Sequence, residues 1–320
     1  MKILLPKKDP NIVRSGRYRE YPRIYSKLDS YVTKILQAHH LQPRKVTLWD
    51  RGISSFVFVL GGKKKLALKI SPRYSLFSEA KFYQKARQAG IPVPKLFAVD
   101  TSKKLIPYEY HITEWIVGKI PDELNSKDLY RCAFELGRMF VRLHQIKMDG
   151  FGLPTSKGWS HKSWLSALKE FSQKEASLKE MKKLFGHGMV SILGRILRDP
   201  KMDIHKPRLT HSDTGEDQFL VIKKNGKWMV EGVLDPGYFI SGDPLIDLAG
   251  AMITWNKSAY RRGFYDGYIS THSLKKEEQY RLLRLRFLSQ AWGATVVNRT
   301  NKKDGSGMAQ DALKLAKKIG

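Results

Sequence analysis

The sequence predicts an α+β protein with two lobes, a small N-terminal lobe rich in strands and a larger, mainly helical C-terminal lobe. Runs with strand character cluster between residues 45 and 117, whereas apolar residues at helical spacing dominate after Gly118. The chain has 320 residues, of which 42% are hydrophobic and 11% aromatic. It is therefore long enough for one large or two smaller domains with a sizeable core.

The predicted N-terminal lobe covers residues 1–117 and includes a helical extension over residues 1–44, with an amphipathic helix at 24–38. A second helix is expected at 76–89, where Gly90 ends it. The segments with strand character are 46–49, 54–60, 65–70, 95–99 and 108–116, the second and third flanking a hairpin turn. We expect these strands to form a small sheet with one helix packed against it.

The predicted C-terminal lobe covers residues 118–320 and begins with a long amphipathic helix at 127–146. Two short β-like pieces, 219–222 and 228–234, interrupt an otherwise helical region. The single cysteine, Cys132, has apolar neighbours at helical spacing, so we expect it in the core and not as a nucleophile. One cysteine also excludes an intrachain disulfide and agrees with a reducing compartment.

The net charge of +28 is the most unusual global feature. Residues 1–50 and residues 271–320 each hold 11 Lys and Arg against 4 Asp and Glu, so together they supply +14. Such a field favours anionic partners, either nucleic acid, an acidic membrane surface or a charged substrate, and a merely solvated surface is the alternative. The sequence has no zinc-ligand spacing, RNA-binding signature or helix-turn-helix to support nucleic acid.

The apolar runs and the N-terminal residues bear on the cellular location of the protein. The longest apolar runs are far shorter than the roughly 20 residues that span a bilayer, so we expect no transmembrane helix. The opening segment MKILLPKKDP lacks the apolar centre of a secretory signal. We expect a cytoplasmic protein.

The stretch HSDTGEDQFLV at residues 211–221 carries the clearest chemical signal. Asp213 is followed five residues later by Gln218, and Asp235 follows 22 residues after Asp213, at the end of the next expected strand. Carboxylates and an amide at the mouths of paired strands can converge on one point that would hold a divalent cation. The alternative is that Asp213 and Asp217 are turn residues and that Asp235 starts a β-turn.

Three weaker signals lie upstream of this stretch. In LALKI, strand alternation places Leu66 and Leu68 on one face and Ala67 and Lys69 on the other, and Glu79 follows in the next helix, where it could pair with Lys69. The segment HITEWIVG at 111–118 would offer free backbone groups to an adenine edge. Each signal alone also fits solvated surface residues or an ordinary edge strand.

Taken together, these elements resemble the aminoglycoside phosphotransferase and choline kinase-like family, a branch of the protein-kinase-like fold. The resemblance covers roughly residues 45 to 295. In family order, the matching elements are Lys69, Glu79, AGIPVP at 89–94, TEWIVG at 113–118, LGRMFVRLHQI at 136–146, GFGLP at 150–154, HSD at 211–213, LDPG at 234–237 and GDPLIDLAG at 242–250.

The resemblance implies a two-lobed kinase-like fold and specific roles. Lys69 would contact the α- and β-phosphates of ATP, and Glu79 would orient Lys69. Backbone groups of Glu114 and Ile116 would meet the adenine. In the catalytic loop at 209–221, Asp213 would be the base at the acceptor hydroxyl.

The segment at 234–250 would bind the metal, with Asp235 and the residue at position 218 as Mg²⁺ ligands. His211 would brace the catalytic loop, and Asp247 would tie that loop to the following helix. All of these roles are what the resemblance implies.

Three departures from the family pattern bear on activity. The phosphate-covering turn DRGISSFVF has only Gly52, so Ser54 and Ser55 would supply the close contacts. Ser212 stands where the family usually has Gly. Gln218 replaces the usual Asn and is one methylene longer, with Asp217 as the fallback ligand if the register differs by one.

The resulting expectation is an ATP-dependent kinase that phosphorylates a hydroxyl of a small molecule. The first alternative is a pseudokinase that binds a nucleotide or acts as a scaffold. The second is a kinase-fold protein whose basic ends bind nucleic acid or an anionic membrane. Because the region after Asp247 is basic, a polycationic aminoglycoside is a poor match for the acceptor.

Overall fold

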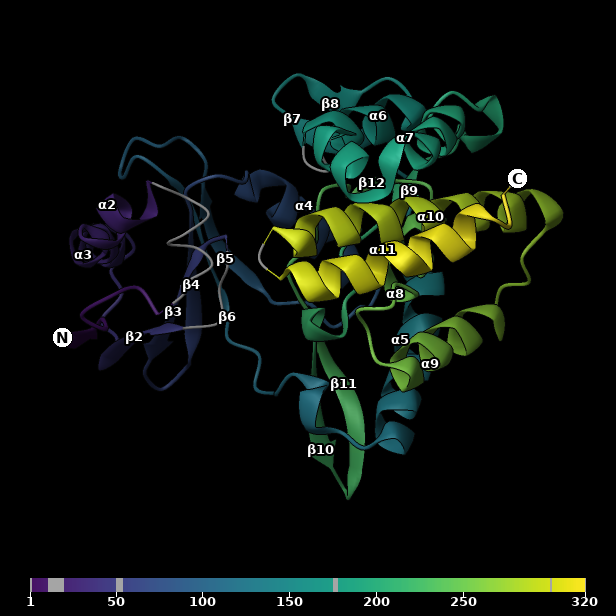
Figure 1. Cartoon of the computed structure of the whole chain (residues 1–320). Coiled ribbons are helices and arrows are strands. Elements are labelled where there is room, and N and C mark those ends of the chain that lie inside the picture. The colour runs from purple at the N-terminus through teal and green to yellow at the C-terminus, as the bar shows by residue number, and fades with distance from the viewer. Residues whose placement is uncertain (1, 11–19, 50–53, 175–177, 300, 320) are drawn as a thin grey trace. The chain divides into compact units, whose positions relative to one another are not determined.

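The computed structural model describes residues 2–10, 20–49, 54–174, 178–299 and 301–319. The chain divides into two compact units (Figure 1). The first comprises Met1–Gln84 and Pro94–Ile116, and the second comprises Lys85–Val93 and Val117–Gly320. The α+β class predicted from the sequence is confirmed, with a sheet-rich N-terminal region and a helical C-terminal region.

The first unit is built on a six-stranded sheet with the order β1-β2-β3-β4-β6-β5. Its elements are β1 (Lys2–Leu4), α2 (Tyr21–Tyr25), α3 (Leu28–Ala38), β2 (Lys45–Trp49), β3 (Phe56–Gly61), β4 (Leu66–Ser71), α4 (Leu76–Gln88, which continues into the second unit), β5 (Leu96–Asp100) and β6 (Glu109–Glu114). The five expected strands are all present. The sequence did not predict β1, which pairs in parallel with β2.

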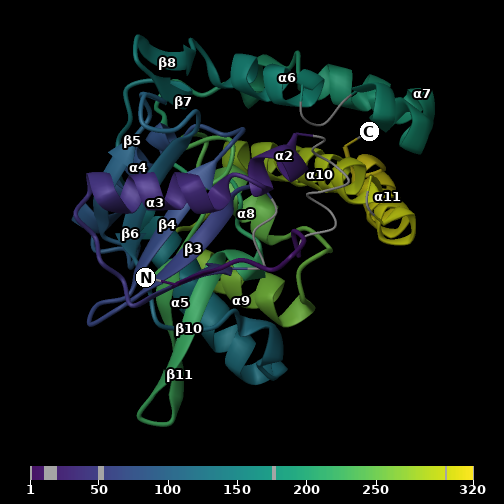
Figure 2. The same ribbon diagram turned by 90° about the vertical axis from the view of Figure 1, so that its left-hand side faces the viewer.

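Alternation along β4 and β6 gives this sheet two different faces. Leu68 and Ile70 on β4 and Ile112 on β6 join a buried cluster with the apolar side of α3, which lies across that face (Figure 2). The opposite face carries Lys69 and His111, which are register partners. The expectation of one helix against the sheet was therefore wrong, because α3 covers one face while the side chains of the other face contact α4.

Helices dominate the second unit. Its helices are η1 (Pro121–Glu123), α5 (Ser126–Leu143), α6 (Trp164–Lys174), α7 (Leu178–Ile196), η2 (Pro200–Met202), η3 (Glu216–Gln218), α8 (Leu245–Ala251), α9 (Ser258–Ile269), α10 (Lys276–Asn298) and α11 (Lys302–Ala316). Cys132 is buried in α5, as the apolar spacing predicted. No helix in the described ranges is long and apolar enough to cross a membrane.

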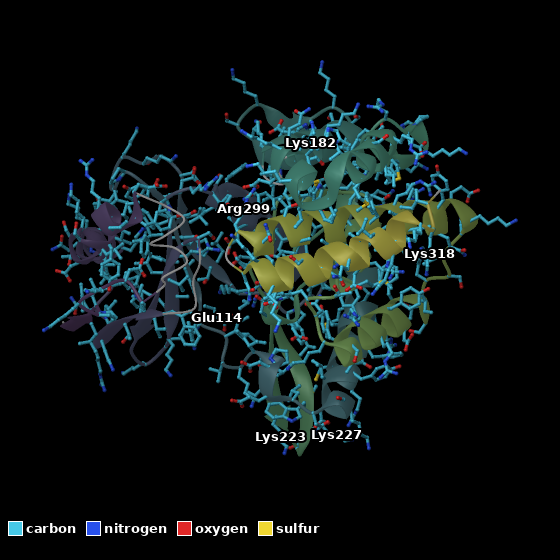
Figure 3. The ribbon with its side chains drawn as sticks, viewed as in Figure 1. Glu114, Lys182, Lys223, Lys227, Arg299 and Lys318 are labelled. Carbon is cyan, nitrogen blue, oxygen red and sulfur yellow. The ribbon has the colours of Figure 1, made fainter. Side chains whose placement is uncertain are left out.

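Two small sheets interrupt these helices. The two expected β-like pieces are β10 (Phe219–Lys224) and β11 (Lys227–Val233), which form an antiparallel hairpin with Lys223 and Lys227 near its tip (Figure 3). A four-stranded sheet with the order β8-β7-β12-β9 was not expected. Its strands are β7 (Phe151–Thr155), β8 (Gly158–His161), β9 (Arg208–Leu209) and β12 (Ser241–Gly242). Two of these strands have only two residues, too few to show an alternating pattern.

Helices α5 and α9 approach each other backbone to backbone. A Cβ added at Gly137 of α5, or at Gly263 or Gly267 of α9, would lie closer to a carbonyl oxygen of the other helix than real Cβ atoms ever do. The close approach matters for the catalytic loop, because Tyr260 of α9 donates a hydrogen bond to the carbonyl of Thr214 at 2.9 Å. Small residues in these two helices thus help to place that loop.

Replacing Gly267 with Ala should force α5 and α9 apart, because the new methyl group would overlap the carbonyl of Phe134. We expect the free energy of unfolding to fall by roughly 1–3 kcal/mol or more. Gly307→Ala in α11 is the matched control, since nothing lies within 4 Å of its added Cβ. That change should stabilise the protein by about 0.5–1 kcal/mol. Equal effects of the two changes in urea unfolding would contradict the proposed packing.

Candidate active site

The first unit holds a buried ion pair between a strand and a helix. Lys69 Nζ on β4 donates to Glu79 Oε2 on α4 at 2.8 Å, and only 11% and 8% of the two side chains are exposed. This is the pair that the sequence suggested. A carboxylate so placed fixes the lysine ammonium in one position.

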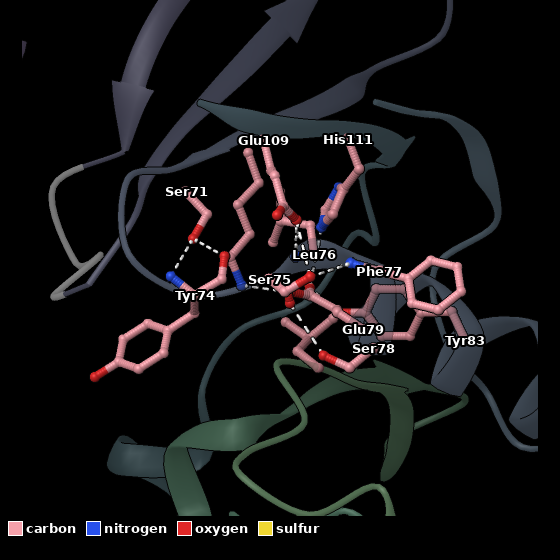
Figure 4. Close-up of polar contacts among 12 residues, drawn as sticks. Ser71, Tyr74, Ser75, Leu76, Phe77, Ser78, Glu79, Tyr83, Glu109 and His111 are labelled. Atoms are coloured by element: carbon pink, nitrogen blue, oxygen red, sulfur yellow. Dashed lines mark hydrogen bonds and ion pairs between the residues drawn. The ribbon is translucent and has the colours of Figure 1, made fainter. Parts of the chain in front are cut away.

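Two further side chains hold the other oxygen of Glu79 (Figure 4). The Tyr83 hydroxyl donates to Oε1 at 2.8 Å, and His111 Nε2 lies 3.1 Å from the same atom. The His111 contact is close enough for an ion pair, but its direction does not satisfy a hydrogen bond, and Nδ1 has no hydrogen-bond partner among the described residues. Burial alone would raise the pKa of Glu79, yet Lys69 and His111 hold that pKa well below its usual range.

Strand β6 also fixes the beginning of α4. The carboxylate of Glu109 accepts hydrogen bonds from the Leu76 backbone amide at 2.7 Å and from the Ser75 hydroxyl at 3.0 Å. Glu109 and His111 point to the same side of the strand, so one row of side chains contacts the helix at two levels. The negative charge at the helix start is itself stabilising.

Some of the groups expected near the adenine and the phosphates already form hydrogen bonds within the protein or are buried. The Glu114 amide donates to the carbonyl of Lys95 at 2.8 Å, which leaves its carbonyl as the group to meet a ligand. The Ser54 carbonyl accepts from the Tyr21 hydroxyl at 2.6 Å, and Ser55 is buried. Gly52 lies outside the described residues.

In the second unit, the catalytic loop is joined to the segment that carries Asp235. The backbone amide of Gly237 donates to the carbonyl of His211 at 2.7 Å, and the hydroxyl of Thr210 donates to the carbonyl of Phe239 at 2.6 Å. His211 Nε2 lies 2.7 Å from the carbonyl of Leu234. Because a carbonyl only accepts, Nε2 carries the hydrogen, and Nδ1 accepts from the Asp213 amide at 3.3 Å.

The buried carboxylate of Asp247 holds the backbone of this loop. It accepts hydrogen bonds from the backbone amides of His211 at 2.8 Å and Ser212 at 2.6 Å. Nε2 of His144, the residue that caps the C-terminus of α5, lies 2.9 Å from the same carboxylate, and its Nδ1 lies 2.9 Å from the Tyr268 hydroxyl. The expected link between the loop and the following helix therefore exists and extends to two more helices.

Ser212 has the left-handed backbone conformation that explains the family's usual glycine. Its φ is +58°, which costs a residue with a Cβ more than it costs glycine. The serine hydroxyl accepts a hydrogen bond from the Phe239 amide at 2.8 Å. This bond offsets part of the strain and adds a contact that glycine could not make.

Negative charge gathers around Asp213. Burial in the loop raises the pKa of Asp213, and the charges of Asp217, Asp235 and Asp247 raise it further. Because Asp213 is exposed to solvent, we assign more of this effect to the neighbouring carboxylates than to burial. Burial and the charge of Asp235 also raise the pKa of Asp217.

The oxygen donors here suit a hard cation such as Mg²⁺. In the described part of the chain, however, no three His, Cys, Asp or Glu residues are close enough to form a complete metal site. Gln218 ends η3 next to β10, and its carbonyl accepts from the Leu234 amide at 2.9 Å. Its side-chain amide makes no hydrogen bond within the described ranges, so it is available to a ligand.

Comparison with known proteins identifies the class. A model of the phosphotransferase enzyme family (APH) matches residues 46–283, more than half of the chain, and the chain belongs to this family. The predicted relationship is confirmed. A comparison with curated protein sequences found no match.

Solved structures support the same fold at low sequence identity. Aminoglycoside phosphotransferase APH(4)-Ia is 15% identical with a TM-score of 0.66, over 91% of this chain and 99% of that one. A putative fructosamine-3-kinase from Haemophilus somnus 129PT is 15% identical with a TM-score of 0.60, over 90% and 95%. A mutant of APH(4)-Ia, with a TM-score of 0.64 and 15% identity over 89% and 97%, was solved as a ternary complex with ADP and hygromycin B.

The sequence analysis did not identify the residues that contact the buried carboxylates of Glu79 and Asp247. His111 and Tyr83 had a detectable signal, since polar residues alternate along β6 and Tyr83 lies one helical turn after Glu79. His144 ends the long helix α5 and had no such signal, because its partner Asp247 is 103 residues away.

Replacing Glu79 with Gln should lower stability at neutral pH, because Lys69 would remain largely buried without its countercharge. We expect a loss of roughly 2–4 kcal/mol in the free energy of unfolding at pH 7. Glu79 has a pKa below its ordinary value of 4.5 in the folded state. Its contribution is therefore complete above that pH and declines as the pH falls further.

Urea unfolding of both proteins at pH 7 and at pH values down to about 3 checks this expectation. Glu123→Gln is the control, because 74% of the Glu123 side chain is exposed and its loss should change little. A difference between Glu79→Gln and the parent that stays constant below pH 4.5 would contradict the assigned role.

Proposed function

We propose that this protein transfers the γ-phosphoryl group of ATP to a hydroxyl group of a small molecule. Family membership supports small-molecule phosphotransferase chemistry. The observation that carries the proposal is the state of Asp213. Hydrogen bonds fix the backbone around it, while its carboxylate is exposed and makes no hydrogen bond within the described residues.

In this proposal Asp213 accepts the proton of the acceptor hydroxyl as the hydroxyl oxygen attacks the γ-phosphorus of ATP. The bond between the γ-phosphorus and the oxygen that bridges it to the β-phosphate breaks, and ADP leaves. A base must be positioned firmly and must still reach its substrate, and both conditions fit Asp213. The surrounding carboxylates strengthen its affinity for a proton. Lys69, held by Glu79, neutralises charge on the α- and β-phosphates.

The adenine would meet the carbonyl of Glu114 and the amide of Ile116, because the Glu114 amide already donates a hydrogen bond to the carbonyl of Lys95. Gly52, Ser54 and Ser55 would border the phosphates. A neutral or anionic hydroxylated acceptor in the cytoplasm suits the chain better than a polycation. The reason is the positive charge of the helices that follow Asp247: α9 carries Arg261 and Arg262, and Lys275 directly precedes α10.

The donor set fits Mg²⁺. Asp235 and Gln218 would hold the ion, with Asp217 as the alternative to Gln218, because Asp217 lies close enough to influence the pKa of Asp213. When bound, Mg²⁺ neutralises phosphate charge. The left-handed conformation of Asp235, with φ of +55°, orients its carboxylate at the end of β11.

Replacing Asp213 with Asn should lower phosphoryl transfer by roughly 10²-fold or more, because the general base is lost. The test measures ADP formation from ATP with a panel of hydroxylated metabolites, and it measures ATP affinity separately. Affinity for ATP should change little. Asp149→Asn, at an exposed site, is the control and should keep full turnover. Unchanged turnover in Asp213→Asn would remove this residue from the mechanism.

Replacing Gln218 tests the unusual residue of the loop. Gln and Asn present the same amide oxygen, shifted by roughly 1.5 Å. Gln218→Ala should raise the Mg²⁺ concentration needed for half-maximal turnover, whereas Gln218→Asn should keep measurable activity. The direct readout is Mg²⁺-dependent ATP affinity from calorimetry. If Gln218→Ala changes neither that affinity nor the rate, Gln218 is not a ligand, and Asp217 becomes the residue to test.

A further inference from the structure

A groove between two helices of the second unit has no role in the proposed reaction. It has a volume of about 450 Å³, within the range of small-molecule sites. Its lining residues are Tyr265, Ile269, Ser273, Leu274, Gln279, Leu282, Leu283 and Arg286. None of them is a candidate active-site residue.

The lining comes from one face of each helix and from the loop that joins them. On α10, Gln279, Leu282 and Arg286 follow one another at helical spacing, and on α9, Tyr265 and Ile269 are one turn apart. From Gln279 to Arg286 the helix rises about 10 Å, so the lining on α10 extends over about that length. The loop residues Ser273 and Leu274 lie at its Gln279 end.

Arg286 is the only charged residue in this lining, and no acid faces it there. The residue is half-buried and forms no hydrogen bond or ion pair within the described residues. Burial lowers the pKa of Arg286, with Tyr265 opposing and Arg261 adding to that shift. The Arg286 end of the groove is therefore electropositive and lacks the countercharge that a half-buried guanidinium needs.

Two acids that lie near the groove residues in the sequence, Glu278 and Asp266, have other partners. Glu278 lies 3.1 Å from His272 and accepts the Lys275 amide at 2.9 Å. Asp266 accepts from the Tyr130 hydroxyl at 2.9 Å. By contrast, the hydroxyl groups of Tyr265 and Ser273 make no hydrogen bond inside the described ranges, so they can serve a ligand as Arg286 can.

We propose that this groove binds a small organic anion, with its acidic head at Arg286 and an apolar body along Ile269, Leu274, Leu282 and Leu283. A guanidinium recognises carboxylate and phosphate groups with paired hydrogen bonds. Leucine and isoleucine favour a hydrocarbon body, and the length of the groove matches a chain of about eight carbons. The ligand class is therefore an amphiphile with one acidic head.

Octanoate is the probe for this site, and the whole unmodified protein is titrated by calorimetry and by NMR. Octanol tests the need for the charge, and inorganic phosphate tests the need for the apolar body. We expect octanoate to bind at least tenfold more tightly than either one. Equal binding of phosphate and octanoate would show only nonspecific attraction to a basic protein and would overturn the proposal, as would equal binding of octanol.

Two variants locate the binding. Arg286→Gln should weaken octanoate binding about tenfold, whereas Arg262→Gln removes the same charge from an exposed position of α9 and should have little effect. Leu283→Trp should fill the groove and weaken octanoate and octanol alike. Thermal unfolding of each variant monitors the fold. If Arg286→Gln folds normally and binds octanoate as the parent does, the proposal is wrong, whatever the outcome for ATP turnover.

Discussion

The catalytic loop depends on one buried carboxylate, that of Asp247. A charge without solvent contact is costly unless several donors satisfy it, and Asp247 has two backbone amides and the imidazole of His144. These amides belong to the two residues immediately before Asp213. The same hydrogen bonds that make the buried charge tolerable therefore set the direction in which the chain enters Asp213, the proposed base.

The first unit uses a buried carboxylate in a different way. Glu79 faces an ammonium, an imidazole and a phenol, so its partners are side chains from β4, β6 and its own helix. Asp247 instead accepts hydrogen bonds from backbone amides, and the Asp213 side chain remains exposed. In both units, a residue that we propose to act on a substrate is held by an acid to which we assign no direct part in the reaction.

Local patterns predicted the elements whose signal lies within one segment. The alternation in LALKI correctly separated Lys69 from Leu68, and helical spacing found α4 and α5. Contacts between segments that are far apart in the chain produced little recognisable pattern in the sequence. Strand β12 has two residues, and the apolar face of α3 carries no mark of the sheet that it covers.

The candidate site shows the same limit. The sequence indicated Asp213 and Asp235 through their spacing, and the family resemblance added Asp247. It could not show that the backbone of Ser212 is left-handed or that its hydroxyl is bonded to Phe239. That bond explains how a residue other than glycine is tolerated beside Asp213. The groove at Arg286 was equally hidden, because it depends on how α9 and α10 pack.

An enzyme and a nucleotide-binding pseudokinase differ in one outcome, the appearance of a phosphorylated product. The most direct measurement uses ATP labelled with heavy oxygen in its γ-phosphoryl group and follows a panel of hydroxylated small molecules by mass spectrometry. We predict that the label appears in a phosphate monoester of at least one acceptor, and that Asp213→Asn prevents it. Binding of ATP and Mg²⁺ with no labelled ester from any acceptor would contradict the account and favour a pseudokinase.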